Sequence, residues 1–204
     1  MAFSSSCQSA PFVLKNTISS WKASSWTPES LSQRVFADTK FSVRFGRRNW
    51  PRGTIQWEND CVRAQTTLAA LLQWWTGGGS ASSDIPDDVT PEAHWFYVDY
   101  KYLFEYLPES ALNDVNWNAL GLDKNATDST FWFGSRDAYT PCHYDSYGFN
   151  VHAQIYGHKR WLLFPPVDGD LLQPVRLPYE ESSVFSFFNK FVDEYLRPSS
   201  QVAI

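Results

Sequence analysis

The amino-acid sequence predicts a mainly β fold with helices in its N-terminal part. Aromatic residues make up 17% of the 204 residues, and large rings suit the half-buried surface of a pleated sheet. Beyond Asp128, short β-type segments are separated by Gly and Pro, a spacing typical of an antiparallel sandwich or barrel. These segments are Ser129–Gly134, Thr140–Asp145, Asn150–Tyr156 and Lys159–Phe164.

The N-terminal part predicts strands and helices in alternation. Residues 11–14 are typical of a short strand, and Thr27–Glu29 predict a helix start with a hydroxyl cap and Pro at the first helical position. Residues 41–45 alternate apolar and polar side chains like a half-buried strand, which we expect Gly46 to end. Residues 60–75 predict a helix, because apolar residues recur there at helical spacing. They are Leu68, Leu71, Leu72 and Trp75.

The rest of the chain is divided by a polar loop. Gly77 to Pro91 is rich in Gly, Ser, Asp and Pro, and residues 97–107 are ambiguous between strand and helix, with a strand entering a short helix before Pro108 favoured. We therefore divide the chain as follows: a disordered N-terminus (1–10), an α/β part (11–76), a flexible loop (77–92), a β core (93–186) and a divergent tail (187–204).

The charge balance and the length of the apolar stretches disfavour two classes of partner. The formal net charge is −5 and the pI about 5.3, whereas proteins that wrap nucleic acid need clustered basic residues. The one basic cluster is typical of a solvated turn and consists of Arg47, Arg48 and Arg52 around Trp50. No apolar stretch approaches the length needed to span a bilayer. We expect neither nucleic-acid nor membrane binding.

Cysteine usage indicates a reducing compartment. Cys7, Cys61 and Cys142 are odd in number and widely spaced, which fits neither a disulfide framework nor a zinc site. The N-terminus shows no signal peptide. We expect a cytoplasmic or nuclear protein.

The chemistry is concentrated between Thr140 and Pro166. His143 and Asp145 are two residues apart, so on a strand they project from one face and can occupy adjacent positions on one metal ion. Alone this pair is weak evidence, because polar residues on a solvent-facing strand give the same spacing.

The next segment predicts a hairpin that strengthens this interpretation. With a two-residue turn at Gly157-His158, residues 150–156 and 159–164 would pair, placing Asn150 and Lys159 on one polar face. That face either meets water or lines a barrel that holds a polar ligand, and Trp161 on the same face favours enclosure.

Several motifs together resemble the JmjC (cupin-like) oxygenases that depend on Fe(II) and 2-oxoglutarate, and in particular the members that associate with a small heat-shock protein. The main motif is T-P-x-H-x-D, followed by Asn, Q-x-x-G-x-K-x-W and Pro-Pro. Supporting motifs are P-x-V-x-x-N from Pro11, DYKY from Asp99, DSTFWFGS from Asp128 and PYEESSVFS from Pro178. The resemblance covers most of residues 11–186 and implies a double-stranded β-helix (jelly-roll or cupin), incomplete at its C-terminal end.

The resemblance also implies roles for five residues. His143 and Asp145 would be the first two iron ligands. Lys159 would bind the distal carboxylate of 2-oxoglutarate as a point charge, with Thr140 on the same carboxylate and Asn150 near the keto-acid end.

The sequence departs from the family pattern at the third iron ligand, a later histidine. Its four histidines are His94, His143, His152 and His158, and the family pattern uses none of the other three as a ligand. We therefore expect a C-terminally truncated domain, an alternative isoform or a gene-model product, that binds iron and 2-oxoglutarate weakly or not at all.

Three functions remain open at this point. The complete domain would be a dioxygenase that hydroxylates or demethylates a protein, with this chain inactive. Alternatively, the chain is a non-catalytic binding or regulatory protein that acts with a small heat-shock protein in the stress response, or a cupin that binds a sugar or metabolite.

Overall fold

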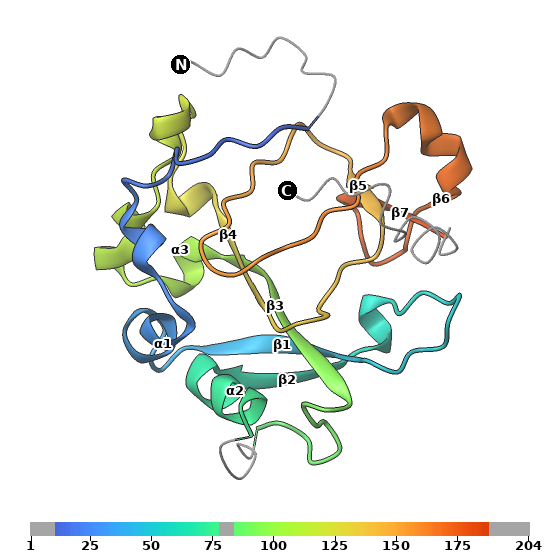
Figure 1. The fold of residues 1–204 in the computed structure, drawn as a ribbon, viewed down its shortest axis with the longest axis horizontal. Coiled ribbons are helices and arrows are strands. Elements are labelled where there is room, and N and C mark those ends of the chain that lie inside the picture. Colours follow the sequence, from blue (N-terminus) through green and yellow to red (C-terminus); the bar gives the residue numbers. More distant parts are fainter. Residues whose placement is uncertain (1–10, 78–83, 188–204) are drawn as a thin grey trace.

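The structure, a computed structural model, describes residues 11–77 and 84–187 (Figure 1). Two antiparallel sheets dominate it: a four-stranded sheet in the order β2-β1-β3-β4 and a three-stranded sheet in the order β5-β7-β6. The strands are β1 (Lys40–Arg47), β2 (Val62–Thr67), β3 (His94–Tyr102), β4 (Thr130–Gly134), β5 (His143–Asp145), β6 (Pro174–Val175) and β7 (Ser183–Ser186).

Short helices surround the sheets. The α-helices are α1 (Pro28–Ser30), α2 (Leu68–Trp75) and α3 (Leu103–Tyr106), and a π-helical turn (Leu31–Val35) continues α1. Short 3-10 helices occur at Lys22–Ser25, Glu58–Asp60, Glu109–Asp114, Trp117–Leu120, Ala126–Asp128 and Pro166–Leu172. Within the described ranges, no helix is both long and apolar enough to cross a bilayer.

The two faces of the larger sheet have different surroundings. Phe41, Val43 and Phe45 on β1 are fully buried, and Phe45 meets Trp74 of α2 with ring centroids 5.2 Å apart. The opposite face of β1 carries Arg44, and the long segment between β5 and β6, drawn in yellow to orange, lies on the side of the sheet away from α2 (Figure 1). Helix α2 therefore covers one face of the sheet. The segment that contains Asn150 and Lys159 lies over the other face, where Lys159 contacts Tyr97 of β3.

Two N-terminal predictions are confirmed. Thr27 caps α1 by accepting a hydrogen bond from the Ser30 N–H at 3.1 Å, with Pro28 at the first helical position. Residues 41–45 form a strand, but Gly46 does not end it. A Cβ at Gly46 would lie 1.9 Å from the Trp95 ring, so this glycine admits the indole of the neighbouring strand.

The helix predicted at 60–75 is wrong in its first half. Val62–Thr67 forms β2 and pairs with β1, and the helix begins at Leu68 with Thr67 as its cap. The apolar residues at helical spacing all lie from Leu68 onward, whereas the preceding residues complete an edge of the sheet. The helix ends before Gly77, whose φ is +69°.

The hairpin predicted at 150–156 and 159–164 is also wrong. Neither segment forms a strand, and residues 11–14 likewise form none. Ala153 and Ile155 still pack partly buried against the core, while His152 and Gln154 are exposed, so the predicted alternation is present without the ladder. A strand needs a hydrogen-bonding neighbour, and the three-stranded sheet does not extend to this segment.

The junction predicted within residues 97–107 is confirmed, because β3 runs directly into α3 and α3 ends before Pro108. Of the loop expected at 77–92, residues 78–83 lie outside the described ranges. Ile85 and Val89 are buried, and the Trp74 indole donates to the Val89 carbonyl at 2.9 Å. The four-stranded sheet combines two strands from before this loop with two from after it.

Candidate metal and co-substrate site

His143 and Asp145 lie on the same face of the short strand β5. Their Nε2 and Oδ1 atoms are 3.8 Å apart, and both side chains are about one-fifth to one-quarter exposed. Strand β7 pairs with β5 in a register that sets Phe185 opposite His143 and Ser183 opposite Asp145. The pair therefore forms two adjacent donors that a single cation can reach.

The Pro141 carbonyl selects the tautomer of the neutral His143 imidazole. The His143 Nδ1 lies 2.7 Å from this carbonyl oxygen, which can only accept, so in the neutral ring the proton is on Nδ1 and the lone pair is on Nε2. The Phe185 ring packs against the imidazole, with the two ring centroids 5.2 Å apart. A backbone carbonyl that binds the distal ring nitrogen is a common support for a metal-binding histidine.

The carboxylate of Asp145 is held by two donors. The Ser183 hydroxyl donates to Oδ1 at 3.0 Å, and the Asn150 amide donates to Oδ2. The structure thus places Asn150, predicted near the co-substrate, directly against the predicted iron-ligand carboxylate. These contacts orient Asp145 and leave lone pairs on both oxygens for a cation.

A third protein donor is not found in the described part of the chain. There, no group of three His, Cys, Asp or Glu side chains comes close enough to hold a metal ion. His94 lies at the start of β3, where its Nδ1 accepts from the Thr90 N–H. His152 contacts Gln154, and His158 is exposed in the turn after Gly157. The donors present fit two positions of a facial iron site.

Lys159 occupies a cage of aromatic rings. Its ammonium donates to the Tyr97 hydroxyl at 3.1 Å and lies 4.5 Å from the Trp161 ring centroid and 5.3 Å from that of Trp132. Burial lowers the pKa of Lys159, and no carboxylate pairs with it among the described residues. A half-buried cation without a carboxylate partner among the described residues favours an anionic ligand.

Thr140, the fifth predicted residue, is half-buried just before β5. Within residues 84–187 it makes no hydrogen bond to Lys159 or Asn150. The structure therefore brings His143, Asp145 and Asn150 together. Lys159 contacts none of these three residues and lies among aromatic rings instead.

Sequence reasoning missed the residues that support this site. Ser183 and Phe185 belong to a motif quoted only for resemblance, and their positions opposite β5 follow from strand register. Tyr97 lies in the aromatic stretch 97–107, whose sequence pattern did not distinguish a strand from a helix and so did not indicate which side chains share a face. Trp161, within K-x-W, was the one available signal, because it follows Lys159 by two residues.

A buried ion pair lies near the Tyr97 ring. Arg44 on β1 donates to Asp99 on β3 at 2.7 Å, and its guanidinium lies 5.6 Å from the Tyr97 ring centroid. The Arg44 side chain is 1% exposed and that of Asp99 is 2% exposed. Glu58 approaches the same guanidinium at 3.8 Å, and the carboxylates raise the pKa of Arg44 against the opposing effect of burial.

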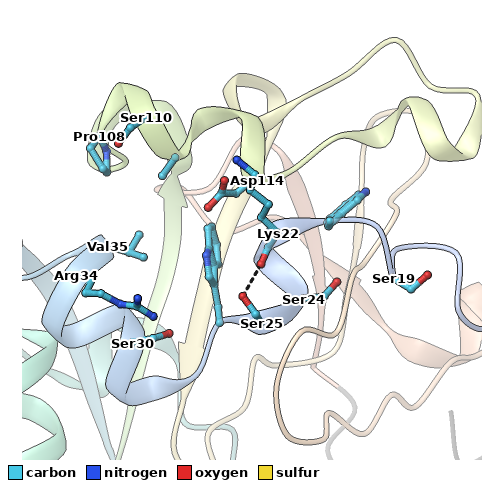
Figure 2. Close-up of a pocket in the computed structure, with 13 residues that line it drawn as sticks. Ser19, Lys22, Ser24, Ser25, Ser30, Arg34, Val35, Pro108, Ser110 and Asp114 are labelled. Atoms are coloured by element: carbon cyan, nitrogen blue, oxygen red, sulfur yellow. Dashed lines mark hydrogen bonds between the residues drawn. The ribbon is translucent and has the colours of Figure 1, made fainter.

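A surface hollow of about 640 Å³ lies elsewhere, between residues 19–35 and 108–114 (Figure 2). It contains none of the five predicted site residues. Figure 2 shows Lys22 and Asp114 turned toward one another and the Ser25 hydroxyl bound to the Lys22 carbonyl, at 2.8 Å. The Ser25 hydroxyl already donates to a backbone carbonyl, and the hollow is open to solvent. We therefore assign no binding site there.

Comparison with known proteins decides the family. The family model described as "Cupin-like domain" matches residues 4–200. The chain belongs to this family. The predicted JmjC-type, cupin-like fold class is thereby confirmed, and the described strands form antiparallel sheets that do not close into a barrel.

The chain is similar in sequence to curated proteins named HSPB1-associated protein 1. It is 38% identical over 186 residues to "HSPB1-associated protein 1" of Bos taurus, covering 90% of this chain and 38% of that protein. The Homo sapiens protein of the same name is 39% identical over 183 residues (88% and 37%). The Danio rerio homolog is 38% identical over 182 residues (88% and 40%).

The chain thus spans less than half the length of these curated relatives. No solved structure gives a significant match. The comparisons therefore establish the cupin-like family of the chain.

Proposed function

We propose that the chain carries part of the site of an Fe(II)- and 2-oxoglutarate-dependent protein hydroxylase or demethylase of the JmjC type. The observation that carries this proposal is the geometry of His143 and Asp145, whose Nε2 and Oδ1 atoms lie 3.8 Å apart on one face of β5. One imidazole and one carboxylate supply two of the three protein positions of a facial iron site.

His143 and Asp145 would bind and orient the metal. The Pro141 carbonyl keeps the His143 lone pair on Nε2, and Ser183 with Asn150 holds the Asp145 carboxylate. When bound, ferrous iron and 2-oxoglutarate supply the oxidising chemistry with dioxygen. The protein residues contribute position and protonation state.

Lys159 would anchor the distal carboxylate of 2-oxoglutarate, with Thr140 and Asn150 as further co-substrate residues. The support is a caged ammonium without a carboxylate partner in the described part of the chain. The carboxylate of the co-substrate would replace the hydrogen bonds to water that the Lys159 ammonium loses on burial. The aromatic rings would exclude water that competes for the ammonium.

We further propose that the 204-residue chain by itself holds iron weakly and does not turn over 2-oxoglutarate. Metal affinity depends on ligand number and fixed geometry, and two protein donors face one cation here. A third donor would come from outside the described residues.

Succinate formation by the purified chain with ferrous iron and 2-oxoglutarate tests this proposal. We expect no iron-dependent turnover, while Mn(II) binding is measurable and decreases in a His143→Ala variant. A His152→Ala variant is the matched control, because His152 contacts Gln154 instead. Iron-dependent turnover would contradict inactivity, and Mn(II) binding equal in both variants would contradict the metal site.

Co-substrate binding gives a second test. The Lys159→Ala substitution is expected to weaken 2-oxoglutarate binding by about tenfold or more, because it removes the cation from the cage. A cupin that binds a sugar or metabolite would instead show ligand affinity that does not depend on Lys159.

A non-catalytic role in the stress response is the second candidate. Its support is the name of the curated relatives, HSPB1-associated protein 1. In this alternative the chain binds a small heat-shock protein as a partner. Co-precipitation at endogenous levels is its test, and capture that persists in the His143→Ala variant would separate partner binding from metal binding.

A further inference from the structure

Strand β5 lies at one edge of the three-stranded sheet and, in the described part of the chain, pairs with β7 alone. Two backbone hydrogen bonds flank this pairing. The Ser186 N–H donates to the Cys142 carbonyl at 2.9 Å, and the Ser146 N–H donates to the Ser182 carbonyl at 2.8 Å. These bonds fix which backbone groups of β5 face β7 and which face away from it.

The backbone groups of His143 and Asp145 face away from β7. In an antiparallel pair, residues that exchange hydrogen bonds with the neighbouring strand alternate with residues that do not. Since Cys142 and Ser146 bond to β7, Tyr144 does so too in the register of the two strands. The N–H and C=O groups of His143 and Asp145 therefore point to the free edge of β5, at a spacing of two residues.

The opposite edge of this sheet is protected against pairing, whereas the edge at β5 is not. The Phe187 N–H donates to the Gln173 carbonyl at 3.2 Å, so by the same alternation the Pro174 nitrogen of β6 faces away from β7 and carries no hydrogen. Proline and lysine commonly protect exposed strand edges. β5 contains neither residue, and no described strand covers its free edge. The unprotected edge is the one that carries the predicted iron ligands.

A strand that paired with this edge would bring alternate side chains to the metal pair. His143 and Asp145 project from one face of β5, and Tyr144 projects from the other. Side chains of directly opposite residues on neighbouring strands share a face, with Cβ atoms about 5 Å apart. One set of side chains of an added strand would thus lie beside His143 and Asp145. The other set would meet the Tyr144 side chain, which is 59% exposed.

We propose that the free edge of β5 binds the main chain of a protein substrate as an added β-strand, which places one substrate side chain beside the His143–Asp145 pair and its neighbour against Tyr144. This inference rests on the function proposed above and adds the form in which the substrate is recognised. An extended main chain fits this edge, because its donors and acceptors recur at the same two-residue spacing. In this mode main-chain hydrogen bonds supply affinity, and alternate side chains supply specificity.

Amide hydrogen exchange of the metal-free chain, followed by NMR, tests the pairing. The probe is the nonapeptide Lys-Thr-Val-Thr-Val-Thr-Val-Thr-Lys, whose residues favour an extended main chain. In the free chain we expect fast exchange at His143 and Asp145 and slow exchange at Tyr144, whose N–H faces β7. With the probe at about ten times its Kd, the His143 and Asp145 amides should slow about tenfold, because each then exchanges only in the unbound fraction. The Tyr144 amide should change little.

Two comparisons by fluorescence anisotropy with the labelled probe identify what it contacts. The same peptide N-methylated at its central residues lacks main-chain donors, so we expect it to bind about tenfold more weakly or worse. Tyr144→Thr removes the ring and keeps a residue that favours strands, and it should lower probe affinity about threefold. Tyr156→Thr is the matched control with unchanged affinity, because Tyr156 is 60% exposed and lies outside the three-stranded sheet.

Four results would overturn the inference. They are unchanged exchange at His143 and Asp145 when the probe is added, undiminished binding of the N-methylated peptide, equal probe affinity in Tyr144→Thr and the unmodified chain, or slow exchange at both amides before any probe is present. The last would mean that a second copy or another segment of the chain already occupies the edge. Because these measurements use metal-free protein, they are independent of the Mn(II) test on His143, and the two proposals can fail separately.

Discussion

The Ser183 hydroxyl on β7 donates to the Asp145 Oδ1 on β5 at 3.0 Å, across a directly opposed pair of the three-stranded sheet. Ser183 is 1% exposed, so this hydrogen bond is shielded from water. The predicted iron-ligand carboxylate is thus oriented by a strand that lies 38 residues further along the chain.

Ser183→Ala is expected to weaken metal binding about tenfold, since residues that support a ligand typically contribute 10- to 100-fold to metal affinity. Isothermal titration with Mn(II) measures this. Ser186→Ala is the control, because Ser186 is also buried on β7 but donates to the Leu172 carbonyl. Equal losses in the two variants would show that the effect comes from a weakened sheet.

Lys159 should make stability depend on pH. Burial lowers its pKa below the ordinary 10.5, so the unfolded chain holds the proton to higher pH than the folded chain does. The cost of burying the ammonium is fully present below the lowered pKa and is relieved as pH rises from there toward 10.5. Lys159→Met should therefore be more stable than the unmodified chain at neutral pH, by a margin that shrinks in alkaline buffer. Urea unfolding at a series of pH values measures the margin, and a constant difference would contradict the prediction.

Arg44→Met is expected to destabilise the fold by about 3–5 kcal/mol, because it leaves the Asp99 carboxylate buried without its partner. Chemical denaturation measures the loss. Arg63→Met is the control: Arg63 approaches Glu58 at 3.6 Å with a side chain that is 42% exposed, and we expect a change below about 1 kcal/mol. A small effect at Arg44 would mean that Asp99 takes up a proton or finds water.

Gly46→Ala tests the contact between β1 and β3. The added Cβ would lie 1.9 Å from the buried Trp95 ring, so we expect a loss of about 1–3 kcal/mol or more. Gly169→Ala is the control, since nothing lies within 4 Å of its Cβ position. Thermal unfolding compares the two, and equal melting temperatures would mean that the indole moves aside at little cost.

Local chemistry in the sequence was sufficient for several elements. The Thr27 cap depends on neighbours three residues away, and the junction of β3 with α3 is bounded by Pro108. The His143–Asp145 pair also follows from strand alternation alone. Such features need no knowledge of distant partners.

The remaining features depend on partners that are distant in the sequence. Residues 62–67 form a strand because they pair with β1, and residues 150–164 pair with no strand of the described part of the chain. The setting of Lys159 likewise requires Tyr97, 62 residues away. Periodicity reports which side chains share a face, but it does not report which chain segment arrives next to it.

The central position of β1 has a consequence for synthesis of the chain on the ribosome. β1 can pair with β2 soon after both have emerged, but its other edge waits for β3, which arrives about 50 residues after β1. Until then the Arg44 guanidinium lacks the Asp99 carboxylate, and the unpaired edge of β1 is open to solvent. Slow translation between residues 67 and 94 would lengthen that interval, so we expect holdase chaperones to engage the chain at this stage.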